Sequence, residues 1–175
     1  HIEMLIKHAC WSARPVDYSA SVQPIIQTPD HSSYPSGHAA ESFAIATVLS
    51  YLMDPSRTTQ EAVEGQHMPF RIAHRVAVNR TVAGVHFPVD SAAGAVLGCQ
   101  IGGAILSLLF GAPLTKSEFR VAKGAATPTS GAFFANSDFL LSEFPTAGWS
   151  TTGHSAPDAG TVASVFADAI RSEWV

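Results

Sequence analysis

A Pro-Ser-Gly-His turn at residues 35–38 stands directly before an apolar run and brings several polar groups to one place. The apolar run predicts a helix that starts at Ser36 or Gly37, and the first turn of a helix presents unpaired N–H groups. Gly37 lets an oxyanion approach the backbone closely, and the Ser36 hydroxyl adds a hydrogen-bond donor. His38 lies one residue further, where it can give or take a proton. The stretch predicts an anion site, although an ordinary serine cap beside an incidental histidine would have the same sequence.

Two cations, Lys7 and Arg14, precede that turn in the stretch KHACWSARP. Their spacing of seven residues is two helical turns, so both side chains would share one face of a continuous helix. Like charges on one face repel each other unless an anion lies between them. The alternative is a pair of solvated surface charges, which this stretch alone does not exclude.

A third polar group, Arg80, His86 and Asp90, lies in the stretch NRTVAGVHFPVD. The planar guanidinium of Arg80 suits two oxygens of a phosphate-like anion. His86 could bond covalently to that anion if Asp90 holds its other ring nitrogen. The alternative is a core histidine followed by a helix cap.

The first elements that must position these residues lie in the N-terminal third of the chain. Apolar residues at helical spacing predict a helix over residues 2–12, which Pro15 ends. Residues 16–34 lack such a period and predict an irregular loop. A long helix is expected after Asp90 or Ser91, either of which can cap it.

The rest of the core also has helical patterns, and no strand-like alternation persists anywhere in the chain. The predicted fold class is therefore all-α, a helical bundle. The further helices that we expect span residues 36–53, 58–65, 69–82 and 91–110.

Composition divides the chain near residue 113. Residues 1–113 contain all three polar groups and form the predicted catalytic core. Residues 114–175 are rich in Ser, Thr, Gly and Pro, which predicts a loop-rich extension ending in a helix over residues 159–174.

The overall composition limits the partners. The chain of 175 residues has a formal charge of −4, so no overall basic field indicates a nucleic-acid partner. Residues 91–115 carry no charge and could cross a bilayer, but their many glycines favour a buried central helix packed closely on a neighbour. We therefore do not expect membrane insertion. The sequence does not determine the compartment, although a soluble periplasmic or secreted protein is favoured over a cytoplasmic one.

The three polar groups together follow one ordered pattern, which residues 7–15, 35–38 and 80–90 satisfy at every position. The pattern is Lys, six residues, Arg-Pro; then Pro-Ser-Gly-His; then Arg, five residues, His, three residues, Asp. In these motifs the chain resembles the superfamily that joins type 2 phosphatidic acid phosphatases, bacterial acid phosphatases and vanadium-dependent haloperoxidases. The resemblance covers about residues 4–111.

The resemblance implies which residues bind the anion. Lys7, Arg14 and Arg80 would neutralise the oxygens of phosphate or vanadate. The Ser36 hydroxyl and the Gly37 N–H would add hydrogen bonds.

It also implies three catalytic residues. His86 would attack phosphorus, or would be the protein ligand of vanadium. His38 would be the acid–base group at the opposite apex, and Asp90 would orient His86. A trigonal-bipyramidal vanadate has the shape of a phosphoryl-transfer transition state, so one pocket suits either chemistry.

The branch of the superfamily is set by smaller features. The stretch HSSYPSGHA resembles the bromoperoxidases, in which a histidine five residues before the serine, here His31, is linked to halide handling. The stretch GVHFPVD also resembles the haloperoxidases. We therefore expect a vanadate-dependent haloperoxidase that oxidises halide with hydrogen peroxide.

Two alternatives remain open. The short connection between His38 and Arg80 is nearer that of the phosphatases. A soluble phosphatase would hydrolyse phosphate monoesters through a phosphohistidine, with no cofactor. The second alternative is a non-enzymatic bundle with a vestigial site.

The resemblance finally implies a bundle that is incomplete at its N-terminus, because the family has helices upstream of the first motif. We expect an upstream fragment, a partner chain or a second protomer to cover the apolar face of residues 2–9.

Overall fold

The computed structural model describes residues 2–112, 114–119 and 149–154, and the first of these ranges is built from helices. The predicted all-α class is therefore confirmed for the core that carries the motifs. The helices are α1 (Ile2–Cys10), α2 (Pro15–Tyr18), α3 (Gly37–Met53), α4 (Thr59–Glu64), α5 (Met68–Val82) and α6 (Pro88–Phe110).

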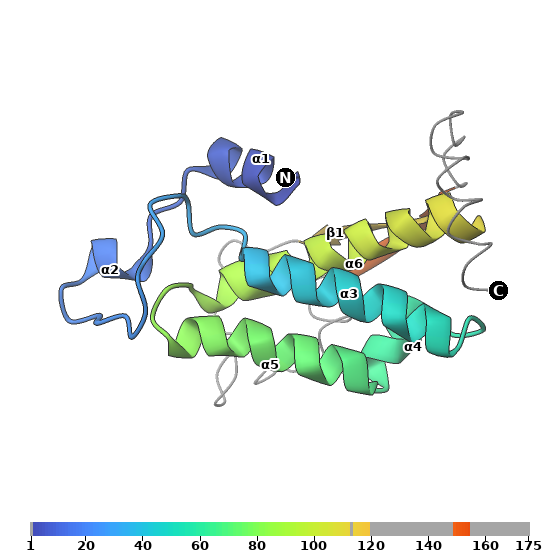
Figure 1. Cartoon of the computed structure of the whole chain (residues 1–175). Helices are drawn as coiled ribbons and strands as arrows, with labels where there is room; N and C mark the ends of the chain where they lie inside the picture. Colours follow the sequence, from blue (N-terminus) through green and yellow to red (C-terminus); the bar gives the residue numbers. More distant parts are fainter. Residues whose placement is uncertain (1, 113, 120–148, 155–175) are drawn as a thin grey trace.

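The three long helices α3, α5 and α6 lie side by side and form the bundle (Figure 1). Helices α1 and α2 lie at the end of the bundle where α3 and α6 begin and α5 ends (Figure 1). Alanines dominate the core, and the fully buried rings of Phe43 and Phe70 meet between α3 and α5 with their centroids 5.9 Å apart. Lys7 and Arg14 lie in or beside α1 and α2, and the other two groups of site residues lie where α3 and α6 begin and α5 ends. All three groups therefore lie at the same end of the bundle.

Helices α3 and α6 pack closely because glycines of α6 face α3. A Cβ added at Gly98 would lie 2.8 Å from the Cβ of Phe43, and one added at Gly102 would lie 2.6 Å from the Cβ of Thr47. Neither position has room for a side chain, so the predicted role of these glycines in close helix packing is confirmed. Among the described helices, α6 alone is long and apolar enough to cross a membrane, and 50% of that apolar stretch is buried inside the protein. A core helix passes the same test.

The N-terminal segment departs from its predicted course. Helix α1 ends at Cys10 because Trp11 adopts a left-handed backbone conformation, with φ of 45°. Pro15 does not end this helix but begins α2, within the predicted loop. The Arg14 N–H donates to the Asp17 carboxylate at 2.8 Å, which stabilises that short helix. Lys7 and Arg14 therefore do not share a helix face, and the prediction that they do was wrong.

The ends of the other helices follow the sequence more closely. Ser36 is the N-cap of α3, as expected, and helices α4 and α6 end within one residue of their predicted ends. Thr58 is the N-cap of α4, and Gly111 ends α6 in a left-handed conformation. Helix α6 begins at Pro88, so Asp90 lies inside its first turn instead of preceding it. The Asp90 carboxylate accepts the Phe87 N–H at 2.9 Å and still satisfies an N-terminal donor.

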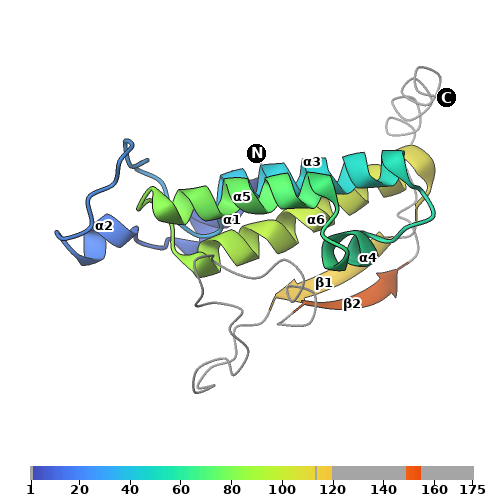
Figure 2. The same cartoon turned by 90° about the horizontal axis from the view of Figure 1, so that it is seen from below.

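Two strands follow the helical range, and the first of them lies against α6 (Figure 2). Strand β1 (Leu114–Phe119) pairs antiparallel with β2 (Trp149–His154). Neither segment was predicted as a strand, because no strand-like alternation persists in the sequence. Pairing between segments this far apart depends on tertiary contacts that neither segment alone reveals. The helix predicted over residues 159–174 lies outside the described residues, and the division at residue 113 stays a prediction.

The apolar side of α1 is exposed in the chain as described. Ile2 is 56% exposed and Leu5 is 65% exposed. The upstream segment or partner that was expected to cover these side chains stays a prediction.

Candidate active site

The three groups of predicted site residues meet at one end of the bundle, joined by hydrogen bonds. The Arg14 guanidinium donates from Nη1 to the Val85 carbonyl at 2.7 Å, beside His86. The Ser36 N–H donates to the Asp90 carbonyl at 2.9 Å, which ties the start of α3 to the start of α6. The third link joins Lys7 to the loop before α3, through Nζ and the Ser33 carbonyl at 3.2 Å.

Lys7 and Arg14 are buried cations that face the same backbone oxygen. Lys7 is 1% exposed and Arg14 is 3% exposed. Lys7 Nζ lies 3.0 Å from the Ser32 carbonyl oxygen, and Arg14 Nη2 lies 3.3 Å from the same atom. Burial lowers the pKa of Lys7, and the charge of Arg14 lowers it further against the opposing effect of Glu3. Two cations are therefore concentrated at one point, and the carboxylate that pairs with Lys7, Glu3, lies at the outer limit of an ion pair, with its Oε1 3.9 Å from Lys7 Nζ.

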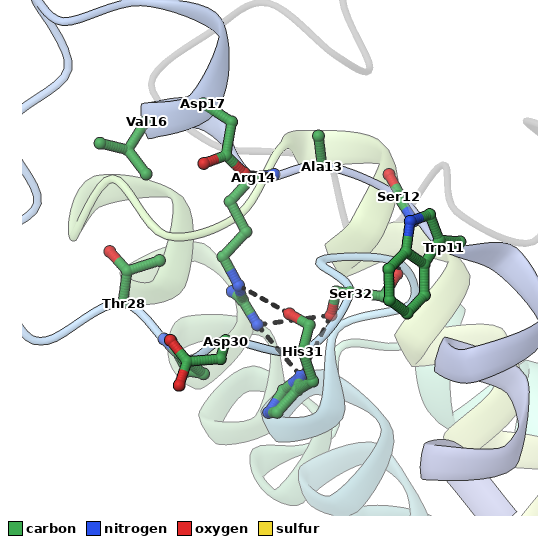
Figure 3. A pocket seen from close by; sticks show the side chains of 11 residues that line it. Trp11, Ser12, Ala13, Arg14, Val16, Asp17, Thr28, Asp30, His31 and Ser32 are labelled. Carbon is green, nitrogen blue, oxygen red and sulfur yellow. Dashed lines mark hydrogen bonds between the residues drawn. The ribbon is translucent and has the colours of Figure 1, made fainter.

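Arg14 also holds His31. Its Nε donates to the His31 carbonyl at 3.1 Å, and its Nη2 lies 3.3 Å from His31 Nδ1 (Figure 3). The guanidinium thus fixes the loop before α3 through several acceptors at once, which its planar fork allows. The structure places His31 at this site as a partner of Arg14.

Arg80 comes from the last turn of α5 and is half-buried. Its Nε is shielded from solvent and has no hydrogen-bond partner among the described residues. Burial lowers the pKa of Arg80, although a guanidinium stays charged near neutral pH. A buried donor without an acceptor is costly, so this nitrogen is suited to an incoming oxyanion.

His86 and Asp90 form a buried pair. His86 Nδ1 lies 3.2 Å from Asp90 Oδ2, and the two side chains are 4% and 1% exposed. An ionised carboxylate can only accept, so Nδ1 carries the proton and Nε2 keeps its lone pair. Burial lowers the pKa of His86, and the hydrogen bond to Asp90 opposes that effect. This arrangement presents a neutral imidazole nitrogen, suitable as a nucleophile or as a ligand.

The start of α3 contributes Ser36, Gly37 and His38. Ser36 and Gly37 are buried, whereas the side chain of His38 reaches solvent. The Ser36 hydroxyl accepts the Ala39 N–H at 3.5 Å, a long cap that leaves its own proton free to be donated. Burial lowers the pKa of His38, and the charge of Arg80 lowers it further. His38 can therefore exchange protons with water while it lies within the field of the anion-binding cations.

A cavity of about 500 Å³ adjoins the site along the loop before α3. Arg14 and His31 are among the residues that line it, and Trp11 and Asp30 lie on opposite sides of His31 in Figure 3. His86 and the start of α3 lie outside the residues that line this cavity. The anion site and the cavity therefore meet at Arg14.

Sequence reasoning missed two contributors. The Ser32 carbonyl accepts from both cations and the Ser33 carbonyl accepts from Lys7, and no residue type indicates which backbone oxygens will do so. Glu3 lies 3.9 Å from Lys7 Nζ and also against Gly37. Its spacing of four residues from Lys7 on a helix is a signal that could have found it.

Comparison with known proteins agrees with these motifs. A sequence model of the PAP2 superfamily matches residues 2–113. The chain is also 31% identical over 107 residues to decaprenylphosphoryl-5-phosphoribose phosphatase of Mycobacterium tuberculosis, in two strains. Those matches cover 61% of this chain and 53% of the relatives, so the chain spans about half the length of the curated relatives it matches. Because the family match covers more than half of the chain and contains all three groups of site residues, the chain belongs to the PAP2 superfamily.

Proposed function

We propose that this chain is a phosphatase that hydrolyses phosphate monoesters through a phosphohistidine at His86. The observation that carries the proposal is an excess of buried positive charge. Lys7 and Arg14 are buried and Arg80 Nε has no partner among the described residues, while the one buried carboxylate beside them, Asp90, is engaged with His86. Glu3 reaches Lys7 only at the outer limit of an ion pair, so the buried positive charge is incompletely balanced, and this favours the binding of a small dense anion.

The comparisons favour a phosphatase over the haloperoxidase expected from the sequence. The relatives are named as phosphatases, and neither comparison supports the haloperoxidase branch. His31, which suggested halide handling, is engaged with Arg14 through its ring and its carbonyl. Vanadate would then bind as an inhibitor that resembles the transition state, rather than as a resident cofactor.

In the proposed first step the phosphate group enters between the cations and the start of α3. Arg80 supplies a free donor at Nε, while Lys7 and Arg14 act mainly through their fixed charge, because most of their donors are engaged. The Ser36 hydroxyl adds a hydrogen bond. Donors fixed by the fold need no reorganisation during the reaction, which favours the charge that develops on the transferring group.

The proposed chemistry then proceeds in two transfers. His86 Nε2 attacks phosphorus, the N–P bond forms, and the bond from phosphorus to the ester oxygen breaks. His38 protonates that leaving oxygen, so that the alcohol departs neutral. A water molecule next attacks phosphorus and His38 takes its proton; the new O–P bond forms, the N–P bond breaks, and inorganic phosphate leaves with His86 restored. Asp90 holds Nδ1 throughout and stabilises the positive charge that His86 gains.

The cavity beside Arg14 can hold the part of the proposed substrate that carries the phosphate group. Its volume of about 500 Å³ lies in the range of sites for small organic molecules. The curated relatives are named for a phosphate on a lipid-linked ribose. We accordingly propose a phosphorylated sugar as the substrate class, with its alcohol part in this cavity.

The test is release of inorganic phosphate by the metal-free protein from a chromogenic phosphate ester and from a pentose 5-phosphate. His86→Ala should abolish release. His38→Ala should slow kcat by about 10²- to 10⁴-fold and retain phosphate binding, because His38 mainly moves protons. His8→Ala, a change of an exposed histidine on α1, is the matched control and should be unaffected. Bromide oxidation by peroxide in the vanadate-loaded protein, without phosphate release from any ester, would overturn the proposal.

A further inference from the structure

The carboxylate of Glu3 lies against the start of α3, at the place where the chain is built to receive an anion. A Cβ added at Gly37 would overlap this carboxylate, whose Oε2 would lie 2.7 Å from it. Lys7 Nζ is 3.9 Å from Glu3 Oε1. Because Gly37 has no side chain, the space beside its backbone is accessible, and the Glu3 carboxylate of the same chain occupies it.

A carboxylate in this position meets the same positive groups as a phosphate would. The N-terminal end of the 17-residue helix α3 carries a partial positive charge, and Lys7 adds a full one. The field of Glu3 also reaches His38, whose pKa it raises against the larger lowering effects of burial and Arg80. Glu3 thus faces two residues of the proposed reaction as well as Gly37.

The hold on Glu3 is weak enough to be released. A separation of 3.9 Å is the outer limit of an ion pair, and the Glu3 side chain remains 17% exposed. It stands in the first turn of α1, whose neighbours Ile2 and Leu5 are largely exposed. A rotation of the side chain toward solvent would uncover Gly37 without moving a packed helix.

From this geometry we infer that Glu3 is an internal competitor for the phosphate site, which covers Gly37 in the free enzyme and displaces inorganic phosphate after hydrolysis. The inference rests on the proposed phosphatase function and adds a residue that sets how strongly the site retains its anion. A dianionic phosphate repels the carboxylate, so Glu3 must leave when the substrate binds. Its return would weaken binding of the product, because the phosphate and Glu3 cannot both occupy the site.

The variant Glu3→Gln tests the inference, since it keeps the size and removes the charge. The inhibition constant of inorganic phosphate should fall about fivefold or more, because the anion no longer has to displace a competing carboxylate that is held by the same positive groups. Orthovanadate should bind more tightly in the same way. The gain should shrink as salt is added, as for any interaction between partly exposed charges. Glu3→Ala should lower both constants as well. This second variant shows that the effect comes from loss of the carboxylate and not from the glutamine side chain.

Glu64→Gln, on the exposed side of α4, is the matched control and should leave both constants unchanged. Phosphate release by the wild type, lost in His86→Ala, establishes the proposed function separately. If release is normal and Glu3→Gln binds phosphate as the wild type does, or more weakly, the competitor role is wrong and the phosphatase stands. If the wild type neither hydrolyses the esters nor binds phosphate, both proposals fail.

Discussion

The interface between α3 and α6 and the N-terminal arm, residues 2–34, both position site residues, but different forces hold them. In the interface, glycines such as Gly98 and Gly102 let the two backbones meet, and they face the buried side chains of Phe43 and Thr47. In the arm, buried cations donate to backbone carbonyls, as Arg14 does to Val85 at 2.7 Å. His38, His86 and Asp90 belong to or border the packed helices, whereas Lys7 and Arg14 belong to the arm.

This difference indicates how stability and function are divided. The arm leaves several large apolar side chains in solvent, with Trp11 84%, Tyr18 73% and Ile25 77% exposed. Its apolar burial is small, so charge-assisted hydrogen bonds must fix its course. We expect changes in the interface to lower the stability of the whole chain, and changes in the arm to disturb the site while the bundle stays folded.

The largest effect is expected from Gly98→Ala in the interface. The new Cβ would overlap the Ala40 carbonyl and lie 2.8 Å from the Cβ of Phe43, so α3 and α6 would have to separate. We expect a loss of about 1–3 kcal/mol in the free energy of unfolding, in spite of the better helix propensity of alanine. Thermal and urea unfolding would measure the loss.

Gly103→Ala is the matched control in the same helix, because nothing lies within 4 Å of its added Cβ. That variant should be as stable as the wild type, or more stable by up to about 1 kcal/mol. Equal stability of the Gly98 and Gly103 variants would show that close packing of α3 on α6 does not hold the bundle.

Much of the helical core could be predicted from the sequence, because its signals are local. Ser36 before an apolar run predicted the start of α3, and α4 lies within the helix predicted over residues 58–65. The residues of the three motifs were also brought together in the structure, as their ordered pattern indicated. The glycines of α6 indicated close packing before the partner helix was known.

The course of the arm could not be predicted in the same way. The end of α1 depends on the left-handed conformation of Trp11, which a non-glycine residue adopts only in a particular tertiary setting. Lys7 and Arg14 converge on the Ser32 carbonyl, and backbone acceptors leave no trace in residue type. Convergence of the two cations was therefore expected for the wrong reason, a shared helix face.

A smaller effect is expected from Arg14→Lys in the arm. Lysine keeps the charge, but it loses the fork that reaches Val85 and the carbonyls of His31 and Ser32 together. The loop before α3 should loosen, and kcat/KM for a phosphate ester should fall about tenfold or more. The free energy of unfolding should change less than in Gly98→Ala.

Arg71→Lys, at an exposed position of α5, controls for the exchange itself and should leave both quantities unchanged. Global unfolding by Arg14→Lys, as severe as that of Gly98→Ala, would mean that the arm is part of the stable core. Wild-type kcat/KM would mean that the fork of Arg14 does not position the site.

The smallest effect is expected from Glu41→Gln, which lies one turn after His38 on α3 and tests the electrostatics of the site without altering either region. Burial lowers the pKa of His38, the charge of Arg80 lowers it further, and Glu41 opposes both. In the proposed reaction His38 must be protonated to act as the acid, so kcat/KM falls as pH rises through its pKa. Removing the Glu41 charge destabilises the imidazolium and lowers that pKa again, so the alkaline limb of the pH profile should move to lower pH.

The acidic limb provides the internal control for Glu41→Gln, because it should report His86, which must be neutral to attack. Burial lowers the pKa of His86 and Asp90 raises it, and Glu41 is not among the groups that shift it. The acidic limb should therefore stay in place, and the plateau of kcat/KM should change by no more than about twofold. A shift of the alkaline limb to higher pH, or an equal shift of both limbs, would show that His38 is not the acid. The bundle would then still position His86 as the nucleophile, but the proton for the leaving ester oxygen would have to come from another group at the mouth of the site.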